Sequence, residues 1–413
     1  MRLPAALRPL EQKHFRLLWT GQAISAVGDG LVSVALAFAV LRIGGSASQL
    51  GLVLAAAVVS RVAFFLVGGV WADRLPRQRV MLASDVVRAA QQVVIGILLI
   101  TGVARIWHLV IGAVVFGAAS AFFMPATTGL LPETIPASSL QQANALMGLS
   151  RSASSVVGPA LSGVLVALVG PGWVFLINAL TFVASALSLA FLRLPDRLMA
   201  LRSSFLRELA AGWHEIAIRP WYWANLCSHA PYGLAIGAFF VLGPVISARQ
   251  LGGAASWGFI AASLGIGSIV GGLVALRFRP SRPLVAANLA LTLGALQLLT
   301  LVPPFPVLVI ALSCIAGYTG LVFLNEVWSA AMQQLIPAEV MSRVDSYDSM
   351  ISSISLPVGF ALAGPAAARF GTRPTLVAAA FILAVPSLLV IAVPAVRGVR
   401  RTRDGRIVER RPA

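Results

Sequence analysis

Twelve long apolar segments constrain this chain more than any other feature of its sequence. A membrane-spanning helix needs about 20 mainly apolar residues. Backbone groups find no water inside a bilayer, so spanning segments form helices or a closed barrel, and continuous apolar runs favour helices. The sequence therefore predicts an all-α integral membrane protein with twelve transmembrane helices, at residues 15–41, 47–71, 80–102, 106–130, 141–168, 171–192, 221–248, 255–277, 283–302, 305–333, 343–367 and 371–394.

The composition agrees with a chain that is solvated mainly by lipid. Of the 413 residues, 58% are hydrophobic and 11% are charged, whereas a soluble domain has about 45–50% apolar and about 25% charged residues. Cys227 and Cys314 both lie in apolar segments and provide neither a disulfide framework nor a metal-binding spacing. We therefore expect no metal site and no bound cofactor.

The basic residues are distributed unequally between the predicted loops. If the N-terminus is cytoplasmic, 23 of the 31 Lys and Arg residues lie on that side, five lie outside, and Arg61, Arg88 and Arg151 lie within helices. Cytoplasmic loops of membrane proteins carry this excess, so we predict that both termini are cytoplasmic. The net charge of +17 then indicates contact with anionic lipid headgroups rather than with nucleic acid.

One long polar stretch, 193–220, divides the chain. It predicts an N-terminal six-helix half (1–192), a cytoplasmic linker (193–220), a C-terminal six-helix half (221–394) and a basic cytoplasmic tail (395–413). Two short motifs recur in the halves at an offset of about 205 residues: Leu-Pro-Glu at 131–133 returns as Ile-Pro-Ala-Glu at 336–339, and Gly-Pro-Ala at 158–160 returns at 364–366. Duplicated halves predict a substrate site near the bilayer midplane, between them.

Asp85, Asp345 and Asp348 lie near the cytoplasmic starts of their predicted spans, whereas Asp29 and Glu326 lie deeper, Asp29 about 12–14 residues into the first helix. An ionisable group at that depth costs roughly 2.5–3.5 kcal/mol and by default marks an ion or substrate pathway. Either residue is therefore a candidate to load and release a proton. The alternative is a structural hydrogen bond between helices, or an ion pair with Arg61 or Arg151.

The embedded arginines allow more than one interpretation. Arg151 belongs to a polar stripe on helix 141–168, which we expect to face the bundle interior or a water-filled cavity. It could bind an anionic group, hold Asp29 ionised, or serve as a strut between helices, whereas Arg61 could simply reach the cytoplasmic interface. Arg88 follows Asp85 by three residues, which predicts an architectural pair at the cytoplasmic rim. The stripe comprises Asn144, Gly148, Arg151, Ser155, Pro159 and Ser162.

The stretch between the second and third predicted helices carries a recognisable motif. It reads Gly69-Val70-Trp71-Ala72-Asp73-Arg74-Leu75-Pro76-Arg77-Gln78-Arg79 and resembles the signature loop of the major facilitator superfamily, with Trp71 and Pro76 as departures. The resemblance implies that Asp73 and the basic residues lock the cytoplasmic helix ends while the transporter faces outward, with Asp85 or Asp345 as partners. Asp73 can also accept from amides at a helix N-terminus. Membrane topology alone would explain the basic residues, but not Asp73.

A second motif, Gly158-Pro159-Ala160-Leu161-Ser162-Gly163, is similar to the fifth-helix motif of antiporters in this superfamily. The segments 84–88, 123–126 and 142–146 resemble its drug:proton antiporter branch, which includes macrolide-efflux-like proteins and siderophore exporters. In the second half Gly271, Gly272 and Arg277 keep the frame of the loop motif without its acid.

These observations predict a secondary transporter of a bacterial cell membrane that exports small amphipathic molecules by alternating access, with H+ as coupling ion and no obligate protein partner. Export of one siderophore or other metabolite, and lipid translocation on the same fold, remain as alternatives. A membrane-embedded enzyme or receptor is less favoured, because the sequence contains no nucleotide-binding loop, metal cluster or nucleophile–base pair.

Overall fold

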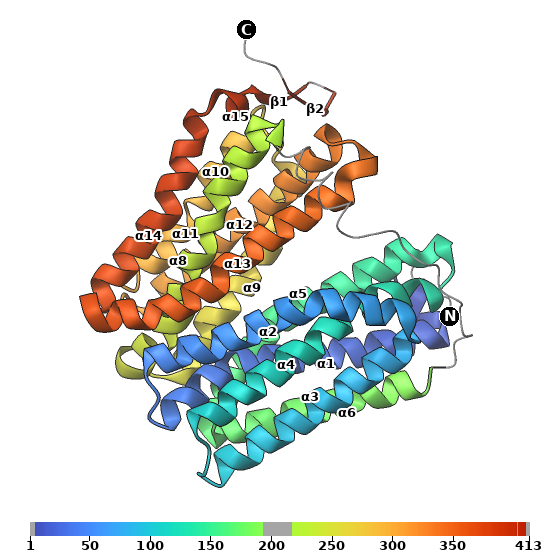
Figure 1. Ribbon diagram of the computed structural model, residues 1–413, viewed down its shortest axis with the longest axis vertical. Helices are drawn as coiled ribbons and strands as arrows, with labels where there is room; N and C mark the ends of the chain where they lie inside the picture. The colour runs from blue at the N-terminus through green and yellow to red at the C-terminus, as the bar shows by residue number, and fades with distance from the viewer. Residues whose placement is uncertain (1–4, 193–216, 403, 410–413) are drawn as a thin grey trace. The chain divides into compact units, whose positions relative to one another are not determined.

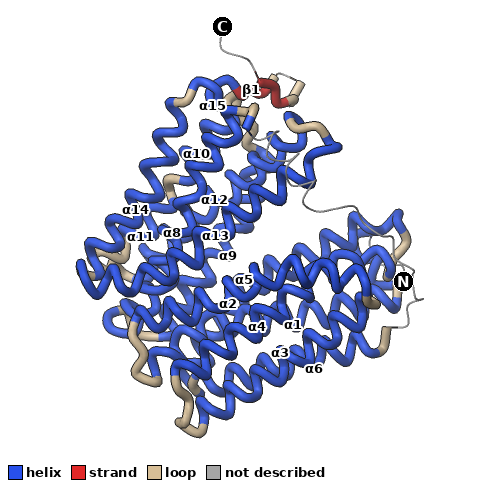
Figure 2. Tube along the Cα trace, viewed as in Figure 1, coloured by secondary structure: helices blue, strands red, loops and turns tan. Residues whose placement is uncertain are grey.

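The computed structural model describes the backbone of residues 5–192, 217–402 and 404–409, but not the side chains of 5–6, 66–74 and most of those at 338–353. It divides into two compact units, one formed by residues 1–200 and 247–262 and the other by residues 201–246 and 263–413. Figure 2 shows that almost all of the described chain is helical. The predicted linker, 193–220, lies mostly outside the described residues.

The described part of the first unit is built from α1 to α6 together with residues 247–262 (Figure 1). Within it α1 packs against α5 and α6, α3 packs against α4 and α6, and α2 packs against α4. Short 3-10 turns precede α1 (Ala5–Glu11) and connect α4 to α5 (Leu131–Glu133 and Ala137–Ser139). The helices are α1 (Lys13–Arg42), α2 (Ala47–Arg74), α3 (Arg77–Ile100), α4 (Ile106–Leu130), α5 (Leu140–Val169) and α6 (Pro171–Ala190).

The second unit is also built from helices, and its final segments include two short strands. Its main packing pairs are α10 and α11 with α12, and α11 and α13 with α14. Residues 247–262, at the end of α8 and the start of α9, belong to the first unit. The elements are α8 (Pro220–Gln250), α9 (Ala254–Arg277), α10 (Pro283–Leu291), α11 (Gly294–Leu299), α12 (Val307–Leu335), α13 (Ala338–Phe370), α14 (Thr372–Leu389), a 3-10 turn (Val390–Ala392), α15 (Pro394–Gly398), β1 (Val399–Arg401) and β2 (Ile407–Glu409).

The helical interpretation of the apolar segments is confirmed, and ten of the described helices are long and apolar enough to cross a membrane. Two boundaries differ from the prediction. The single helix expected at 283–302 is two helices, α10 and α11, separated by a turn at Thr292–Leu293. The Thr292 hydroxyl donates to the carbonyl of Leu289 at 2.6 Å, a local bond that competes with helix continuation. The link between α2 and α3 is only Leu75–Pro76, because α2 continues through the motif.

The same short connection occurs in both units. A single glycine joins α5 to α6 and another joins α13 to α14: Gly170 has φ 87° and ψ 163°, and Gly371 has φ 92° and ψ 155°. Side chains disfavour this positive-φ region, whereas glycine adopts it readily. Both glycines end a long helix and begin a shorter one. This shared geometry supports the internal duplication that the sequence motifs predict.

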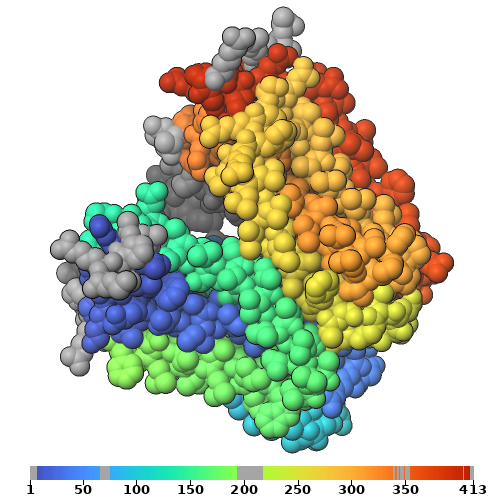
Figure 3. All heavy atoms as spheres, turned by 180° about the vertical axis from the view of Figure 1, so that it is seen from behind, coloured from blue at the N-terminus to red at the C-terminus, as the bar shows by residue number. Residues whose placement is uncertain are grey.

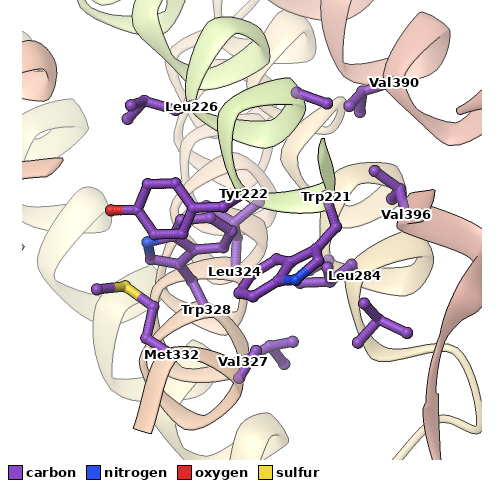
Figure 4. Packing of buried hydrophobic residues seen from close by; sticks show 14 of the residues in the cluster. Trp221, Tyr222, Leu226, Leu284, Leu324, Val327, Trp328, Met332, Val390 and Val396 are labelled. Atoms are coloured by element: carbon purple, nitrogen blue, oxygen red, sulfur yellow. The ribbon is translucent and has the colours of Figure 1, made fainter. Parts of the chain in front are cut away.

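An aromatic cluster forms part of the core of the second unit. Trp221 and Tyr222, at the start of α8, are fully buried and lie next to Trp328 on α12, with ring centroids 5.7 and 5.0 Å from that of Trp328. Figure 4 shows the three rings turned toward one another among aliphatic side chains, including Leu284. Burial of such large side chains stabilises the contact between α8 and α12.

The basic tail folds onto this core, where the sequence predicted only a charged cytoplasmic extension. β1 and β2 form an antiparallel hairpin, and Val396, Val399 and Ile407 are buried in the same cluster as the three aromatic rings. The space-filling view shows the red C-terminal segment lying over one end of the second unit (Figure 3). Burial and the nearby charge of Arg279 lower the pKa of Arg401.

Candidate functional site

Asp29 lies near the middle of α1, 16 residues after its first residue and 13 before its last. Its side chain is exposed, and the described residues provide it with no hydrogen bond and no ion pair. The charges that act on it come from Arg88 and Asp85 on α3. Asp29 is therefore an accessible carboxyl group within electrostatic reach of a second carboxyl and a guanidinium group.

Glycines hold the backbone beside Asp29 close to two other helices. A Cβ atom on Gly28 would overlap the side chains of Asn178 and Thr181 on α6, and one on Gly30 would lie 2.9 Å from the Cα atom of Gly158 on α5. Real Cβ atoms do not approach other atoms so closely, because interiors are packed at van der Waals contact. The two glycines therefore fix the segment that carries Asp29 between α5 and α6.

Asp85 and Arg88 form a buried ion pair on α3. Asp85 is fully buried and Arg88 is 3% exposed, and Arg88 Nη2 donates to Asp85 Oδ1. The guanidinium group lies between two phenyl rings, 4.1 Å from the centroid of Phe123 on α4 and 4.4 Å from that of Phe182 on α6. Such cation–π contacts hold a cation in place where water is excluded.

The structure places this pair within the bundle, rather than at the rim as the sequence analysis expected. Asp85 lies eight residues after the first residue of α3, and Arg88 lies eleven, which is about 12 and 16 Å along the helix. Their i,i+3 spacing predicts the contact between them, but their depth follows from packing against α4 and α6.

A polar stripe on α6 lies beside the pair and was missed in the sequence. Asn178, Thr181 and Ser185 recur at spacings of three and four. They face α1, because Asn178 and Thr181 lie against Gly28 and Gln22 Nε2 donates to Ser185 Oγ at 3.4 Å. Within α6, Thr181 Oγ1 donates to Asn178 Oδ1 at 2.9 Å. Ser185 also lies next to the Asp85 carboxylate. The spacing of three and four residues between these polar residues, within an apolar span, is the sequence signal that could have predicted the stripe.

Several polar atoms in this region are buried without a hydrogen-bond partner among the described residues. They are Asp85 Oδ2, Arg88 Nε, Gln92 Oε1 and Asn178 Nδ2. Buried polar atoms without partners are uncommon, because each costs about 1–3 kcal/mol of desolvation. Asp85 Oδ2 and Gln92 Oε1 can therefore still accept a hydrogen bond, and Arg88 Nε and Asn178 Nδ2 can still donate one.

The other predicted cavity residues are exposed. Arg61 on α2, Asn144 and Arg151 on α5, and Glu326 on α12 all have exposed side chains, and Asn144 Nδ2 donates to the carbonyl of Leu140 in its own helix at 2.9 Å. Within the described part of the first unit, neither Arg61 nor Arg151 forms an ion pair with Asp29.

The basic residues of the loop motif have different partners from those expected. Arg77 Nη1 lies 2.9 Å from Glu133 Oε1 and donates to the carbonyl of Gly129 at 2.6 Å, whereas Asp85 is paired with Arg88. Arg79 is exposed. The expected pairing of the loop with Asp85 is therefore wrong for Arg77, because Glu133 lies closer to the helix end. The structure does not describe the side chains of Asp73, Arg74 and Asp345 or the surroundings of Gly69.

The fifth-helix motif forms close helix contacts on two sides. Gly158 and Pro159 are buried, and Gly158 faces Gly30 on α1. A Cβ atom on Gly163 would lie 2.8 Å from the Cα atom of Gly258 on α9, within the same unit. Small residues allow membrane helices to approach this closely. In the second unit, Gly237 on α8 and Gly359 on α13 make a similar contact.

A polar group in the core of the second unit was also missed. Asn288 Nδ2 on α10 donates to Asn225 Oδ1 on α8 at 2.8 Å, and the ring of His229 lies 5.6 Å from that of Trp328. None of these side chains is a candidate site residue from the sequence. An asparagine in each of two apolar spans was the signal for an interhelical hydrogen bond.

The comparisons with known proteins agree with this architecture. The family model for transmembrane secretion effectors matches residues 4–403. Macrolide efflux protein A of Streptococcus pyogenes is 24% identical over 366 residues, which cover 87% of this chain and 90% of the relative. Multidrug efflux pump Tap of Mycobacterium tuberculosis is 28% identical over 397 residues, covering 91% and 92%.

Solved structures share the fold at low sequence identity. The nucleoside transporter NupG has a TM-score of 0.70 at 12% identity and covers 92% of this chain and 98% of its own. A bacterial homologue of the human lysosomal transporter Spinster, in an inward-facing unoccupied conformation, has a TM-score of 0.68 at 14% identity and covers 92% and 96%. Together with the family match, they identify the chain as a multi-pass membrane transporter of the major facilitator superfamily, in the family of transmembrane secretion effectors.

Proposed function

We propose that this protein exports small amphipathic, drug-like molecules across a bacterial cell membrane in exchange for protons. The observation that carries the proposal is Asp29, an exposed carboxyl group at the middle of a membrane-spanning helix. A charged group at that position is costly and by default marks an ion or substrate pathway. The efflux named in two relatives, macrolide efflux protein A and multidrug efflux pump Tap, supports the substrate class.

The proposed topology has twelve spans with both termini in the cytoplasm. Ten described helices qualify by length and composition. The broken pair α10–α11 and the 33-residue α13 would provide the other two. The basic residues that precede α1 and follow α14 then face the cytoplasm, as the excess of positive charge in cytoplasmic loops requires.

The proposed mechanism is alternating access, in which the transport site opens to each side of the membrane in turn. A proton and a substrate can shift this equilibrium only by the difference in their affinities for the two states. A carboxyl group within the span meets this condition if its access to water changes between them. Asp29 is our first choice for the proton-binding group and Glu326 the second.

Transport by everted membrane vesicles tests the proposal. Vesicles containing the protein are supplied with a panel of dyes and antibiotics that includes a macrolide, with and without an imposed pH gradient. We expect accumulation of at least one compound, which collapses when a protonophore dissipates the gradient. Accumulation that is insensitive to the gradient would contradict proton coupling, and no accumulation of any compound would contradict drug-like export.

A further inference from the structure

We propose that Asp29, Asp85 and Arg88 form one proton-binding site, in which an exposed and a buried carboxyl group share a single proton beside a fixed guanidinium group. This inference rests on the proposed proton coupling and gives the buried pair a role in it. From the sequence, Asp29 and Glu326 are the candidate proton carriers, and Asp85 and Arg88 are expected to form an architectural pair.

The net charge of the three groups depends on how many protons they bind. With all three groups ionised, the site contains two negative charges and one positive charge, whereas binding of one proton makes it neutral. An uncompensated charge is costly inside a membrane protein, and two carboxylates near each other do not both ionise readily. Arg88 and Asp85 act on Asp29 in opposite directions, so the charge of Asp29 depends on the protonation of the pair.

The two carboxylate oxygens of Asp85 differ in their hydrogen bonds. Its Oδ1 accepts from Arg88, and its Oδ2 is buried without a hydrogen-bond partner in the described chain. A purely structural ion pair would be expected to use both carboxylate oxygens, since buried acceptors are normally satisfied. Oδ2 is therefore the atom available to accept a proton.

Polar side chains of α6 lie between the α1 segment that carries Asp29 and the Asp85 carboxylate. The polar stripe on α6 begins with Asn178, which lies against Gly28, the residue before Asp29, and ends with Ser185, which lies beside Asp85. Asn178 is fully buried, and its Nδ2 has no partner among the described residues. Hydroxyl and amide groups at this spacing can carry ordered water between the two carboxyls.

The position of Arg88 is fixed by its neighbours. Its guanidinium group is held between Phe123 and Phe182, so it stays beside Asp85 and keeps its electrostatic effect on Asp29. A proton enters at exposed Asp29, leaves its carboxyl oxygen and binds Asp85 Oδ2. Arg88 then becomes the counter-charge of the Asp29 carboxylate. The positive charge stays in place while the proton moves.

The surrounding elements contribute no competing charge in the described chain. α4 presents Phe123 to the pair, and α6 presents Phe182 and Ser185. From α1, Gln22 reaches Ser185. The other embedded arginines, Arg61 on α2 and Arg151 on α5, are exposed and form no ion pair with Asp85.

Infrared difference spectroscopy of the purified protein in lipid vesicles, without substrate, tests the site. The carboxyl C=O band is followed as a function of pH in the wild type and in Asp29→Asn, Asp85→Asn and Arg88→Gln. We expect each single variant to change the band: removal of either carboxyl group moves the midpoint of the other to lower pH, and removal of the cation moves the midpoint to higher pH. Interacting groups titrate as a pair, with shifts of about one pH unit or more.

Two further proteins keep the test decisive. Asp85→Asn/Arg88→Gln replaces the pair by neutral side chains. It takes the place of Arg88→Gln in the titration if that single variant does not fold. We expect the double variant to shift the midpoint of the Asp29 titration. Arg77→Gln removes the other α3 arginine that pairs with a carboxylate and should leave the band unchanged. An Asp29 titration that is identical in wild type, Asp85→Asn and the double variant would overturn the shared site.

The result is independent of the transport assay. Coupled titration without export of any panel compound would support the proton site and contradict the proposed substrate class. If export depends on protons but the Asp29 carboxyl band titrates at the same pH in the wild type and in Asp85→Asn, the proposed function stands and this inference is overturned.

Discussion

Gly30 on α1 and Gly158 on α5 face each other backbone to backbone, and a Cβ atom on Gly158 would lie 2.6 Å from the Cα atom of Gly30. The contact lies one residue from Asp29 and within the fifth-helix motif. The fifth-helix motif therefore packs directly against the segment of α1 that carries the exposed carboxyl group of Asp29.

Gly158→Ala is expected to destabilise the first unit by about 1–3 kcal/mol, because an added methyl group must displace the α1 backbone. Thermal unfolding in detergent micelles measures the effect. Gly148→Ala, on the same helix, is the matched control: a Cβ atom there meets nothing within 4 Å, and alanine is the better helix former. Equal unfolding temperatures for Gly158→Ala and wild type would contradict the close contact.

Asp29→Asn keeps the shape of the side chain and removes its charge. We expect it to abolish transport driven by a pH gradient while the protein folds and inserts normally, since the amide cannot take up the proton. The measurement is accumulation in everted vesicles at matched protein levels. Asp404→Asn, which changes an exposed acid of the C-terminal hairpin, should transport like the wild type. Unchanged proton-driven transport in Asp29→Asn would rule this carboxyl out.

Arg88→Gln leaves the Asp85 carboxylate buried without its cation. Breaking a buried ion pair in this way typically costs about 3–5 kcal/mol, whereas neutralising both partners costs much less. We therefore expect Asp85→Asn/Arg88→Gln to unfold at a higher temperature than Arg88→Gln alone. The comparison uses the same micelles for both proteins, and a double variant no more stable than the single one would show that Asp85 is not the group that Arg88 compensates.

Ile407→Asn places an amide in the aromatic core of the second unit, where Ile407 is 3% exposed. Lost apolar burial and an unsatisfied polar group together suggest a cost of about 2–4 kcal/mol. Limited proteolysis should then cleave the C-terminal hairpin faster. Val408→Asn changes the next residue of the same strand, which is only half-buried, and should have a smaller effect. Equal cleavage of the two variants would mean that the hairpin does not depend on this contact.

Local features of the fold were predictable because they depend on nearby residues. Long apolar runs predict helices whatever the tertiary structure. Asp85 and Arg88 share a helix face at i,i+3, so their contact could be expected. The turns at Gly170 and Gly371 fall where two predicted spans end and the next begin.

Features that depend on distant residues were not predictable. Arg77 pairs with Glu133, 56 positions away, and sequence spacing gives no reason to prefer that carboxylate to Asp85. The break between α10 and α11 lies in a continuous apolar run. The tail contains so many arginines that its three buried residues form no recognisable strand pattern, and only the aromatic core of the second unit explains its fold.

The C-terminal hairpin ties together parts of the second unit that are distant in sequence. The amide of Arg401 donates to the carbonyl of Ser281, between α9 and α10, and the amide of Ile407 donates to Gln334 Oε1 on α12, both at 2.8 Å. These segments therefore belong to one mechanical block. A pair of spin labels at Ser281 and Thr402 would report a constant distance in every state of the transport cycle, and so would provide an internal ruler for label pairs that span the two units.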